Sequence, residues 1–367
     1  MSSVLLLCLL AASPDGGVEE AVDGGLTDLK LVPIVAPAYS PELSFFIVAG
    51  GVATWNGSAN VPRSSLAVVA GVSTIGGFLT QTRLTSYWME DRVRLAAFVD
   101  VRDQPDHYFG KGFENGLNRP QGADTTAYRR TAWLVNPHLQ VLIRPSLFFG
   151  TVADFTGTLA NAVSAGMAAD PDFQSRGGAS VVNSGLGFSL TWDTRDVPVN
   201  ARTGMVLSAQ WLAYGPWFAG TTRWQSLTLD YRQHVTLFRE GSTLSWQLKH
   251  RSTWGDVPWS DLSQLGTPWD LRAYRWGRYR DASATFALVE YRYMFPFPKD
   301  TIWARLGAAV WLGVGALGSG LLPDVTQLLP AAGLGLRVVV QDRVTVRFDF
   351  GLGRSSYAFY FQFLEAF

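Results

Sequence analysis

Apolar and charged side chains alternate along much of this sequence, and this alternation is the feature that most constrains its fold. In the segment 344–350, Val344, Val346, Phe348 and Phe350 alternate with Arg347 and Asp349. In the segment 229–235, Leu229, Tyr231 and Val235 alternate with Asp230, Arg232 and His234. A period of two is that of a β-strand, whose successive side chains point to opposite faces. The pattern predicts an all-β protein whose strands have one apolar face and one charged face.

The composition indicates that the apolar face meets lipid. Charged residues make up 16% of the chain and aromatic residues 13%, whereas charged residues make up about 25% of a typical soluble domain. No window approaches the roughly 18 consecutive apolar residues of a transmembrane helix. A soluble sandwich rarely places Phe, Tyr and Trp on its outer face this often. A transmembrane antiparallel β-barrel with a polar lumen accounts for both faces.

Turn chemistry divides the chain into fifteen runs of strand length. We predict strands at 43–55, 64–75, 78–90, 92–102, 125–135, 138–151, 180–193, 203–214, 222–236, 242–253, 282–294, 301–313, 329–340, 343–352 and 357–367. Bacterial barrels have an even number of strands. We therefore expect sixteen, with the missing strand in 28–40 or 153–179, and fourteen as the fallback.

The connections between these runs are of two kinds. The segments "MEDR", "VNPH", "FREGS" and "QDR" are short and polar, whereas 103–124, 152–179, 254–281 and 314–328 are long. Short turns at one end and long loops at the other are typical of outer-membrane barrels.

The N-terminal region predicts export. The run "MSSVLLLCLLAAS", residues 1–13, is typical of a signal peptide cleaved near Ala12 or Ser13. Attachment of lipid to Cys8 is a weaker alternative, because Leu7 stands where a small residue is expected. We predict a disordered or extended lead-in over 14–40 and the barrel over 41–367. The single cysteine excludes internal disulfides and a cysteine metal site.

Signals for an enzyme or a nucleic-acid partner are weak. Thirty basic residues balance thirty acidic ones, whereas nucleic-acid binding favours a basic surface. The segment "GVGALG", 313–318, matches a dinucleotide-binding pattern but lacks the βαβ unit that gives the pattern meaning. The four histidines show no ligand spacing, and no GxSxG motif occurs. We predict no enzyme activity, cofactor or metal, and no nucleic-acid partner.

The turn that follows the predicted strand 180–193 carries Asp193, Arg195, Asp196, Pro198 and Gly204. This pattern resembles the D-x-R-D…P…G turn at the periplasmic edge of the BamA/TamA superfamily of outer-membrane insertase and translocase barrels, and two further motifs and the C-terminal segment also resemble that family. Its long-loop motif (V/I/L)-R-G-(F/Y) is matched by Leu271, Arg272, Ala273 and Tyr274, with alanine in place of glycine. Its C-terminal pattern is matched by Gly333, Gly335, Arg337, Arg347, Asp349 and Gly351. The aromatic alternation through Phe363 to Phe367 resembles the terminal signal of such barrels.

Two departures from the family accompany these matches. Members carry F-x-D-x-G on the second strand after the loop, whereas Gly313 stands here in place of the aspartate. Members of the insertase type also carry POTRA modules before the barrel, and the sequence before Leu43 is too short for one. We therefore expect a barrel-only member.

The resemblance implies that the loop 254–281 folds into the lumen, where Arg272 needs a partner. A guanidinium group favours carboxylates, which it can bind through two hydrogen bonds. Strand parity places Asp349 and Glu290 in the lumen, and we predict that they are the partners of Arg272. The alternative is a basic extracellular loop that contacts lipopolysaccharide phosphates, which Arg275, Arg278 and Arg280 fit better than Arg272.

The resemblance also implies a location and a function. We expect a barrel in the outer membrane of a Gram-negative bacterium, in contact with lipid and lipopolysaccharide. It would help insert or export client proteins through a lateral seam between 43–55 and 357–367, with no periplasmic partner specified. The alternatives are a passive pore or structural barrel and, less favoured, an outer-membrane enzyme.

Overall fold

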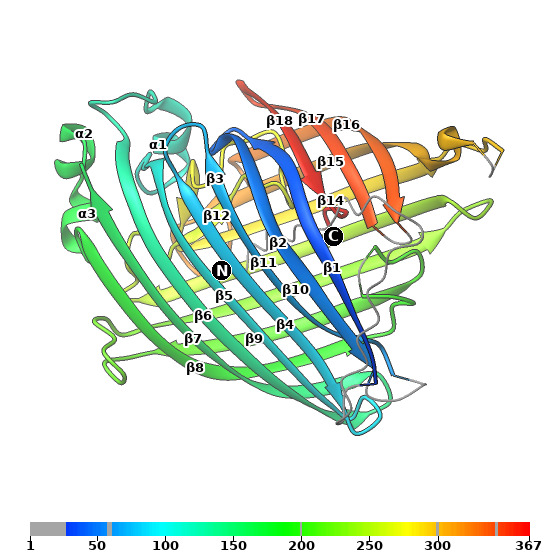
Figure 1. Ribbon diagram of the computed structural model, residues 1–367. Coiled ribbons are helices and arrows are strands. Elements are labelled where there is room, and N and C mark those ends of the chain that lie inside the picture. The colour runs from blue at the N-terminus through cyan, green and yellow to red at the C-terminus, as the bar shows by residue number, and fades with distance from the viewer. Residues whose placement is uncertain (1–26, 57–60, 199, 299–300, 342–343) are drawn as a thin grey trace.

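The strands close into a barrel, as the alternation predicts. A computed structural model describes residues 27–56, 61–198, 200–298, 301–341 and 344–367. Within them, sixteen antiparallel strands form one closed sheet, in which β1 pairs with both β2 and β18 (Figure 1). The predicted fold class and the strand number of sixteen are confirmed.

The barrel strands are β1 (Thr27–Ser40), β2 (Ser44–Asn56), β3 (Ser64–Ser73), β4 (Phe78–Trp88), β5 (Val93–His107), β6 (Ala127–Arg144), β7 (Leu147–Asn161), β8 (Ser180–Asp193), β9 (Gly204–Tyr214), β10 (Trp224–Thr236), β11 (Ser242–Gly255), β14 (Ser283–Met294), β15 (Leu306–Gly318), β16 (Leu328–Gln341), β17 (Val344–Gly353) and β18 (Ser356–Phe363). The connections carry α1 (Phe113–Asn118), α2 (Ala165–Ala168), α3 (Pro171–Ser175), β12 (Ser263–Leu265), β13 (Tyr279–Asp281) and the 3-10 helix η1 (Ile302–Arg305).

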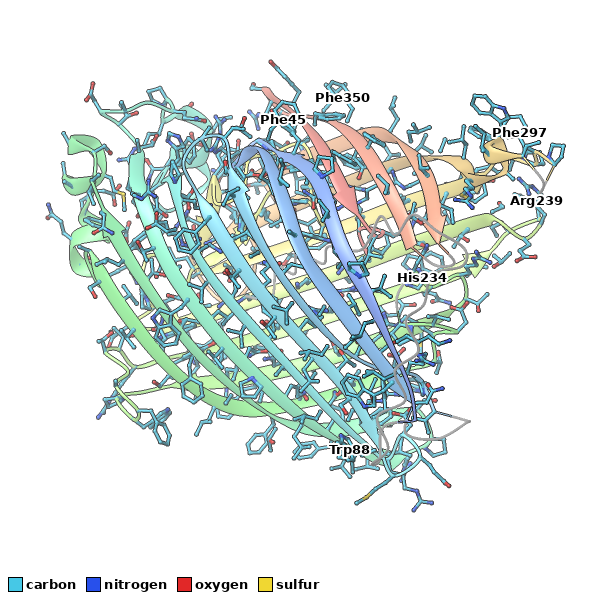
Figure 2. All side chains as sticks on the ribbon, in the orientation of Figure 1. Phe45, Trp88, His234, Arg239, Phe297 and Phe350 are labelled. Carbon is cyan, nitrogen blue, oxygen red and sulfur yellow. The ribbon has the colours of Figure 1, made fainter. Side chains whose placement is uncertain are left out.

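The outer face of the barrel is apolar, as β8 illustrates. Leu186, Phe188, Leu190 and Trp192 are exposed, and the residues between them point inward. Phe45 and Phe350 likewise project from the wall (Figure 2). Such a face suits the hydrocarbon region of a membrane. Among the described residues, no helix is long and apolar enough to cross a membrane.

The first strand lies where a disordered or extended lead-in was predicted. β1 pairs with β2 from Ser40↔Ser44 to Thr27↔Asn56, so the barrel begins at Thr27, before the predicted start at residue 41. Of the two segments expected to hold the missing strand, 28–40 is the correct one. Proline lacks the N–H that a ladder needs, but it is tolerated where one edge of a strand is sparsely paired, as it is in β1. The predicted signal peptide and residues 14–26 lie outside the described residues.

A tight turn was predicted at "VNPH", and this prediction is wrong. β6 continues through Pro137 to Arg144, and the turn follows at 145–146. The pairing of β6 with β7 passes from Val135↔Phe155 to His138↔Val152, and the Asn136 side chain donates a 2.9 Å hydrogen bond to the Ala153 carbonyl oxygen. A side chain thus compensates locally for the N–H that proline lacks.

Two other predicted boundaries are also wrong. The strand predicted at 301–313 begins at Leu306, because residues 302–305 form η1. The loop predicted at 152–179 begins only after Asn161, because β7 extends to that residue.

The connection between β11 and β14 enters the lumen, and we call residues 256–282 the lumenal loop. Its buried residues Leu265, Leu271 and Tyr274 pack with Trp311 and Leu329 of the barrel wall. The helices α1, α2 and α3 lie together at one end of the barrel, which we call the loop end (Figure 1). We call the other end, where β1 begins and β18 ends, the terminus end.

Candidate functional site: the lumenal loop and its arginine network

A tight turn in the lumenal loop positions Arg272. The Asp270 carboxylate accepts hydrogen bonds from the backbone N–H groups of Thr267 (2.6 Å), Gly266 (3.1 Å) and Leu271. An aspartate that accepts from neighbouring amides is a common way to fix a turn. The adjacent Leu271 fits against the wall because Gly315 has no side chain. A Cβ atom there would lie 2.6 Å from Leu271 Cδ1.

The Arg272 guanidinium binds two carboxylates in the lumen. Its Nη1 donates to Asp349 Oδ2 at 2.9 Å and its Nη2 donates to Glu290 Oε2 at 2.5 Å. All three side chains are fully buried. The guanidinium also lies 4.4 Å from the centre of the Trp311 ring, within the range of a cation–π interaction. These are the two carboxylates that strand parity predicted as partners of Arg272. Gly313 stands where the family carries an aspartate, and Asp349 supplies a carboxylate in its place.

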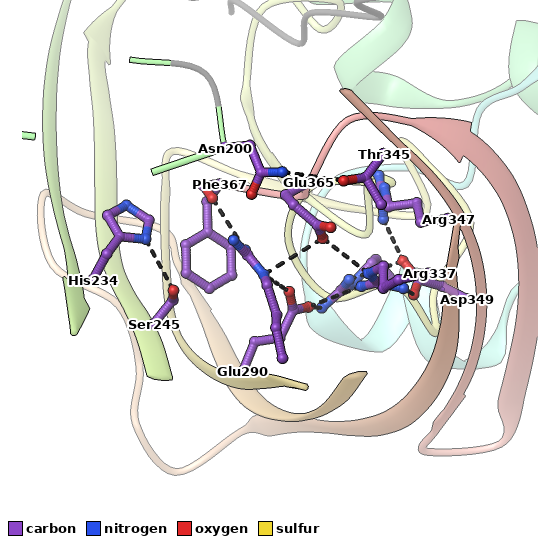
Figure 3. Close-up of polar contacts among 12 residues, drawn as sticks. Asn200, His234, Ser245, Glu290, Arg337, Thr345, Arg347, Asp349, Glu365 and Phe367 are labelled. Atoms are coloured by element: carbon purple, nitrogen blue, oxygen red, sulfur yellow. Dashed lines mark hydrogen bonds and ion pairs between the residues drawn. The ribbon is translucent and has the colours of Figure 1, made fainter. Parts of the chain in front are cut away.

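Three more arginines extend this network (Figure 3). Arg337 donates to Asp349 at 2.7 Å and to Glu365 at 2.9 Å, and Arg347 also binds Asp349. Arg292 donates to Glu290 at 2.6 Å. We call these four arginines and three carboxylates the arginine network. Because its members are buried, removal of one partner breaks ion pairs that water cannot replace, at a cost of about 3–5 kcal/mol.

The strand that precedes the C-terminal residue ends earlier than predicted. β18 ends at Phe363, and Leu364 to Phe367 turn into the lumen. The Phe367 ring lies 5.3 Å from the Arg292 guanidinium, which also donates to the Phe367 carbonyl oxygen at 3.1 Å. The aromatic alternation of β18 therefore does not continue on the outer face to Phe367, which points inward. The side chain of Phe363 lies outside the described ones.

The lumenal loop contacts β18 and the turn between β1 and β2, on the two sides of the closure of the barrel. On the β18 side, Ser356 Oγ donates to the Ala273 carbonyl oxygen at 2.8 Å, and the Tyr360 hydroxyl donates to that of Tyr274 at 3.3 Å. On the other side, the Trp276 N–H donates to Glu42 Oε1, in the β1–β2 turn, at 2.9 Å. Residues 273–276 thus bridge β18 and the first hairpin.

The pairing of β1 with β18 closes the barrel, and we call it the seam. Among the described residues, its ladder is formed by Tyr39↔Phe361, which joins the last turn-side residues of β1 to the C-terminal part of β18. The neighbouring ladder of β17 with β18 runs from Val346↔Phe363 to Gly353↔Ser356. The seam is therefore joined by fewer backbone pairs than the ladder beside it. The predicted seam at 43–55 is displaced by one strand.

The remaining arginines of the loop face inward. Arg280 is 3% exposed and donates to the carbonyl oxygens of Gly277 and Trp259. Arg278 donates to the Gly116 carbonyl oxygen at 2.8 Å. The prediction that Arg280 suits contact with lipopolysaccharide is therefore wrong.

The predicted turn motif forms a self-contained structure at the terminus end. Arg195 binds Asp193 through two hydrogen bonds of 2.9 and 2.8 Å and donates to the Pro198 carbonyl oxygen at 3.0 Å. Asp196 accepts from the N–H groups of Arg202 and Thr203. Gly204 has a φ of 92°, and a Cβ atom there would lie 2.2 Å from the Thr194 carbonyl oxygen. Glycine is therefore required at this position.

Sequence reasoning missed three members of this site. Arg292 lies two positions after Glu290 and so shares its lumenal parity, which is a signal that could have found it. Glu365 and Glu42 gave no such signal, because one follows a strand and the other lies in a turn. Among the described residues, no group of His, Cys, Asp and Glu side chains is arranged to hold a metal ion.

A closed sixteen-strand antiparallel barrel with an apolar outer face and an arginine-bearing loop in its lumen has the architecture of an outer-membrane barrel. Residues 66–362 match the Omp85 superfamily domain, and the chain belongs to that superfamily. This confirms the family resemblance predicted from the motifs.

Solved structures agree on the fold. BamA from Haemophilus ducreyi lacking POTRA domains 1–3 matches with a TM-score of 0.60 and 12% identity over 91% of this chain and 70% of that one. CdiB from Acinetobacter baumannii matches with a TM-score of 0.54 and 13% identity over 92% of this chain and 60% of that one. CdiB from Escherichia coli matches with a TM-score of 0.56 and 12% identity over 94% and 63%. The chain thus spans less than two thirds of either CdiB. No curated protein matches the sequence.

Proposed function

We propose that this protein helps insert or export client proteins at the outer membrane of a Gram-negative bacterium through the seam between β1 and β18. The observation that carries the proposal is the sparse backbone pairing at the seam, beside ladders that are continuous. An opened seam would expose unpaired backbone groups, and such an edge is a template for an added strand. Membership of the Omp85 superfamily supports the proposal.

The lumenal loop would act as the latch of this seam. Its residues 273–276 are bonded to β18 and to Glu42, and Arg272 anchors the same segment to the wall. Opening would therefore require the loop to release at least one side. The carboxylates Asp349 and Glu290 keep the loop in place while no client is bound.

A disulfide across the seam tests the proposal. Tyr39 and Phe361 are cross-strand partners, and the Cα distance of such pairs suits a disulfide. The variant Tyr39→Cys/Phe361→Cys, in a Cys8→Ser background, would be placed in liposomes with an unfolded client barrel. The matched control is Val35→Cys/Ala49→Cys, which joins β1 to β2 and leaves the seam free.

We expect wild type to accelerate client folding, the oxidised seam variant to lose this activity, and a reductant to restore it. The oxidised control should remain active. Equal activity of the oxidised and reduced seam variants would exclude the seam as the route. A wild type that gives steady conductance and no acceleration would instead favour a passive pore or structural barrel. The presence of the lumenal loop inside the barrel argues against a wide pore.

A further inference from the structure

A cavity of about 450 Å³ lies in the lumen on the side away from the seam. The lumenal loop covers it with Thr267, Trp269 and Asp270, and the turn after β8 and the segment 364–367 border it toward the terminus end. Its wall is formed by the inward faces of β9, β10 and β11. Trp276, the last residue of the latch segment 273–276, also lines the cavity.

Two cations of β11, Lys249 and Arg251, line this cavity on the same face of the strand. Among the described residues, no carboxylate oxygen lies within the 4.0 Å ion-pair distance of either side chain. Asp230 lies opposite Lys249 across the sheet, but Arg232 binds its carboxylate at 3.0 and 2.7 Å and Gln247 donates to it at 2.8 Å. The nearest acid is thus already engaged.

Arg251 is held by neutral groups. Its Nη1 donates to the Asp261 carbonyl oxygen at 2.9 Å and to Ser263 Oγ at 3.3 Å. The Asp261 carboxylate itself accepts from Asn183 at 2.9 Å and from Ser260 at 2.7 Å. Arg251 is therefore fixed in place by neutral acceptors, while the Asp261 and Asp154 carboxylates attract it only from beyond ion-pair distance.

The lining of the cavity carries five cationic side chains and three acidic ones, which are Arg83, Arg195, Arg232, Lys249 and Arg251 against Asp230, Asp270 and Glu365. Arg195 and Arg232 are paired with Asp193 and Asp230, and Glu365 is paired with Arg337. The remaining acid of the lining, Asp270, accepts the backbone amides of the loop turn. Cations held in a confined space attract an anion more strongly than they would in open water.

We infer that Lys249 and Arg251 form a binding site for a compact oxyanion, a phosphate or carboxylate group, that enters the lumen. The ammonium supplies a point charge, and the guanidinium donates through hydrogen bonds of fixed direction. Thr228, directly opposite Arg251, and Ser226 line the same cavity and offer hydroxyl donors. Two cations and two hydroxyl groups suit three or four oxygen acceptors.

Calorimetric titration of the detergent-solubilised full chain with inorganic phosphate, at low ionic strength, tests the site. We expect one saturable site in wild type, with binding about tenfold weaker in Lys249→Gln and weaker again in Lys249→Gln/Arg251→Gln. Arg144→Gln removes a positive charge from an exposed position at the end of β6 and should bind as wild type does. Heat-modified electrophoretic mobility verifies that each variant is a folded barrel.

Absence of saturable binding to wild type would overturn the inference, as would equal binding by the double variant and by Arg144→Gln. A second titration with acetate distinguishes the two sources of the oxyanion. Competition with phosphate supports a site open to carboxylates, and its absence assigns the site to phosphate. Neither titration depends on the seam, so failure of the proposed assembly function would leave this result unchanged.

Discussion

The two sides of the barrel wall are held together in different ways. β10 and β11 pair without interruption from Trp224↔Gly255 to Thr236↔Thr243, and their lumenal face carries polar side chains such as Asp230 and Gln247. At the seam, the β1–β18 ladder is sparse, and the lumenal face of the first hairpin is apolar. That face comprises Ile34, Ala36, Ala38, Phe46 and Val48. Trp269 of the lumenal loop packs against this cluster.

The difference shows what replaces backbone pairing at the seam. Each ladder hydrogen bond contributes about 0.5–1.5 kcal/mol net, so a sparsely paired edge loses stability that something else must supply. Here the lumenal loop supplies it through apolar packing and through hydrogen bonds to both edges. Side-chain contacts of this kind can be released as a unit, whereas a continuous ladder cannot.

The largest expected effect comes from Arg272→Ala. It leaves Glu290 and Asp349 buried with one partner fewer and frees the loop, at a cost of about 3–5 kcal/mol. Urea unfolding followed by tryptophan fluorescence would measure the shift of the midpoint. Arg272→Lys keeps the charge but cannot reach both carboxylates in the same way. Its urea midpoint should lie between those of wild type and Arg272→Ala. An unchanged midpoint in Arg272→Ala would show that the anchor does not hold the loop.

The second prediction compares the loss of stability when a buried carboxylate is neutralised near the seam, at Asp349, and on the opposite wall, at Asp230. Asp349 binds three arginines, whereas Asp230 binds one arginine and a glutamine. Asp349→Asn should therefore cost about 3 kcal/mol and Asp230→Asn about 1 kcal/mol. The same unfolding measurement applies to both. Equal losses would mean that the arginine network carries no special share of the stability.

A smaller effect is expected where the loop approaches β17. A Cβ atom on Gly351 would lie 2.2 Å from the Arg272 carbonyl oxygen, so Gly351→Ala must displace the loop, at about 1–3 kcal/mol. Gly51→Ala is the control, because its Cβ atom would have ordinary contact at 3.4 Å. If both variants unfold at the same urea concentration, the close packing of the loop against β17 contributes nothing.

The smallest effect concerns pH. Burial raises the pKa of Glu42, while the Trp276 N–H opposes this rise. A raised carboxyl pKa favours the neutral form in the folded state. The contribution of Glu42 to the free energy of unfolding is therefore present at acidic pH and is lost as pH rises through the folded pKa. Glu42→Gln, which keeps the acceptor for Trp276, should be the more stable protein at pH 7 and lose that advantage near pH 4. A constant difference between the two proteins across this range would contradict the account.

The alternation of residues was enough to predict the barrel and the lumenal position of Asp349 and Glu290, because strand parity is a local property. The first strand was predicted only as one of two candidates for the missing strand. Its prolines are acceptable beside a sparsely paired edge, and the sequence of one strand does not show how its neighbour pairs. The inward turn after Phe363 depends on Arg292 and Arg337, which lie far away in sequence. Contacts of this kind are set by the closed barrel and leave no local pattern.

We propose that the lumenal loop holds the seam shut, and distances between spin labels across the seam test this proposal. The seam labels are placed at Val35→Cys and Tyr357→Cys, exposed positions on β1 and β18. Labels at Leu229→Cys and Leu248→Cys, exposed on β10 and β11, serve as the control pair. In a Cys8→Ser background, Arg272→Ala should broaden the seam distances toward longer values and leave the control pair unchanged. Unchanged seam distances, or equal broadening of both pairs, would contradict the claim.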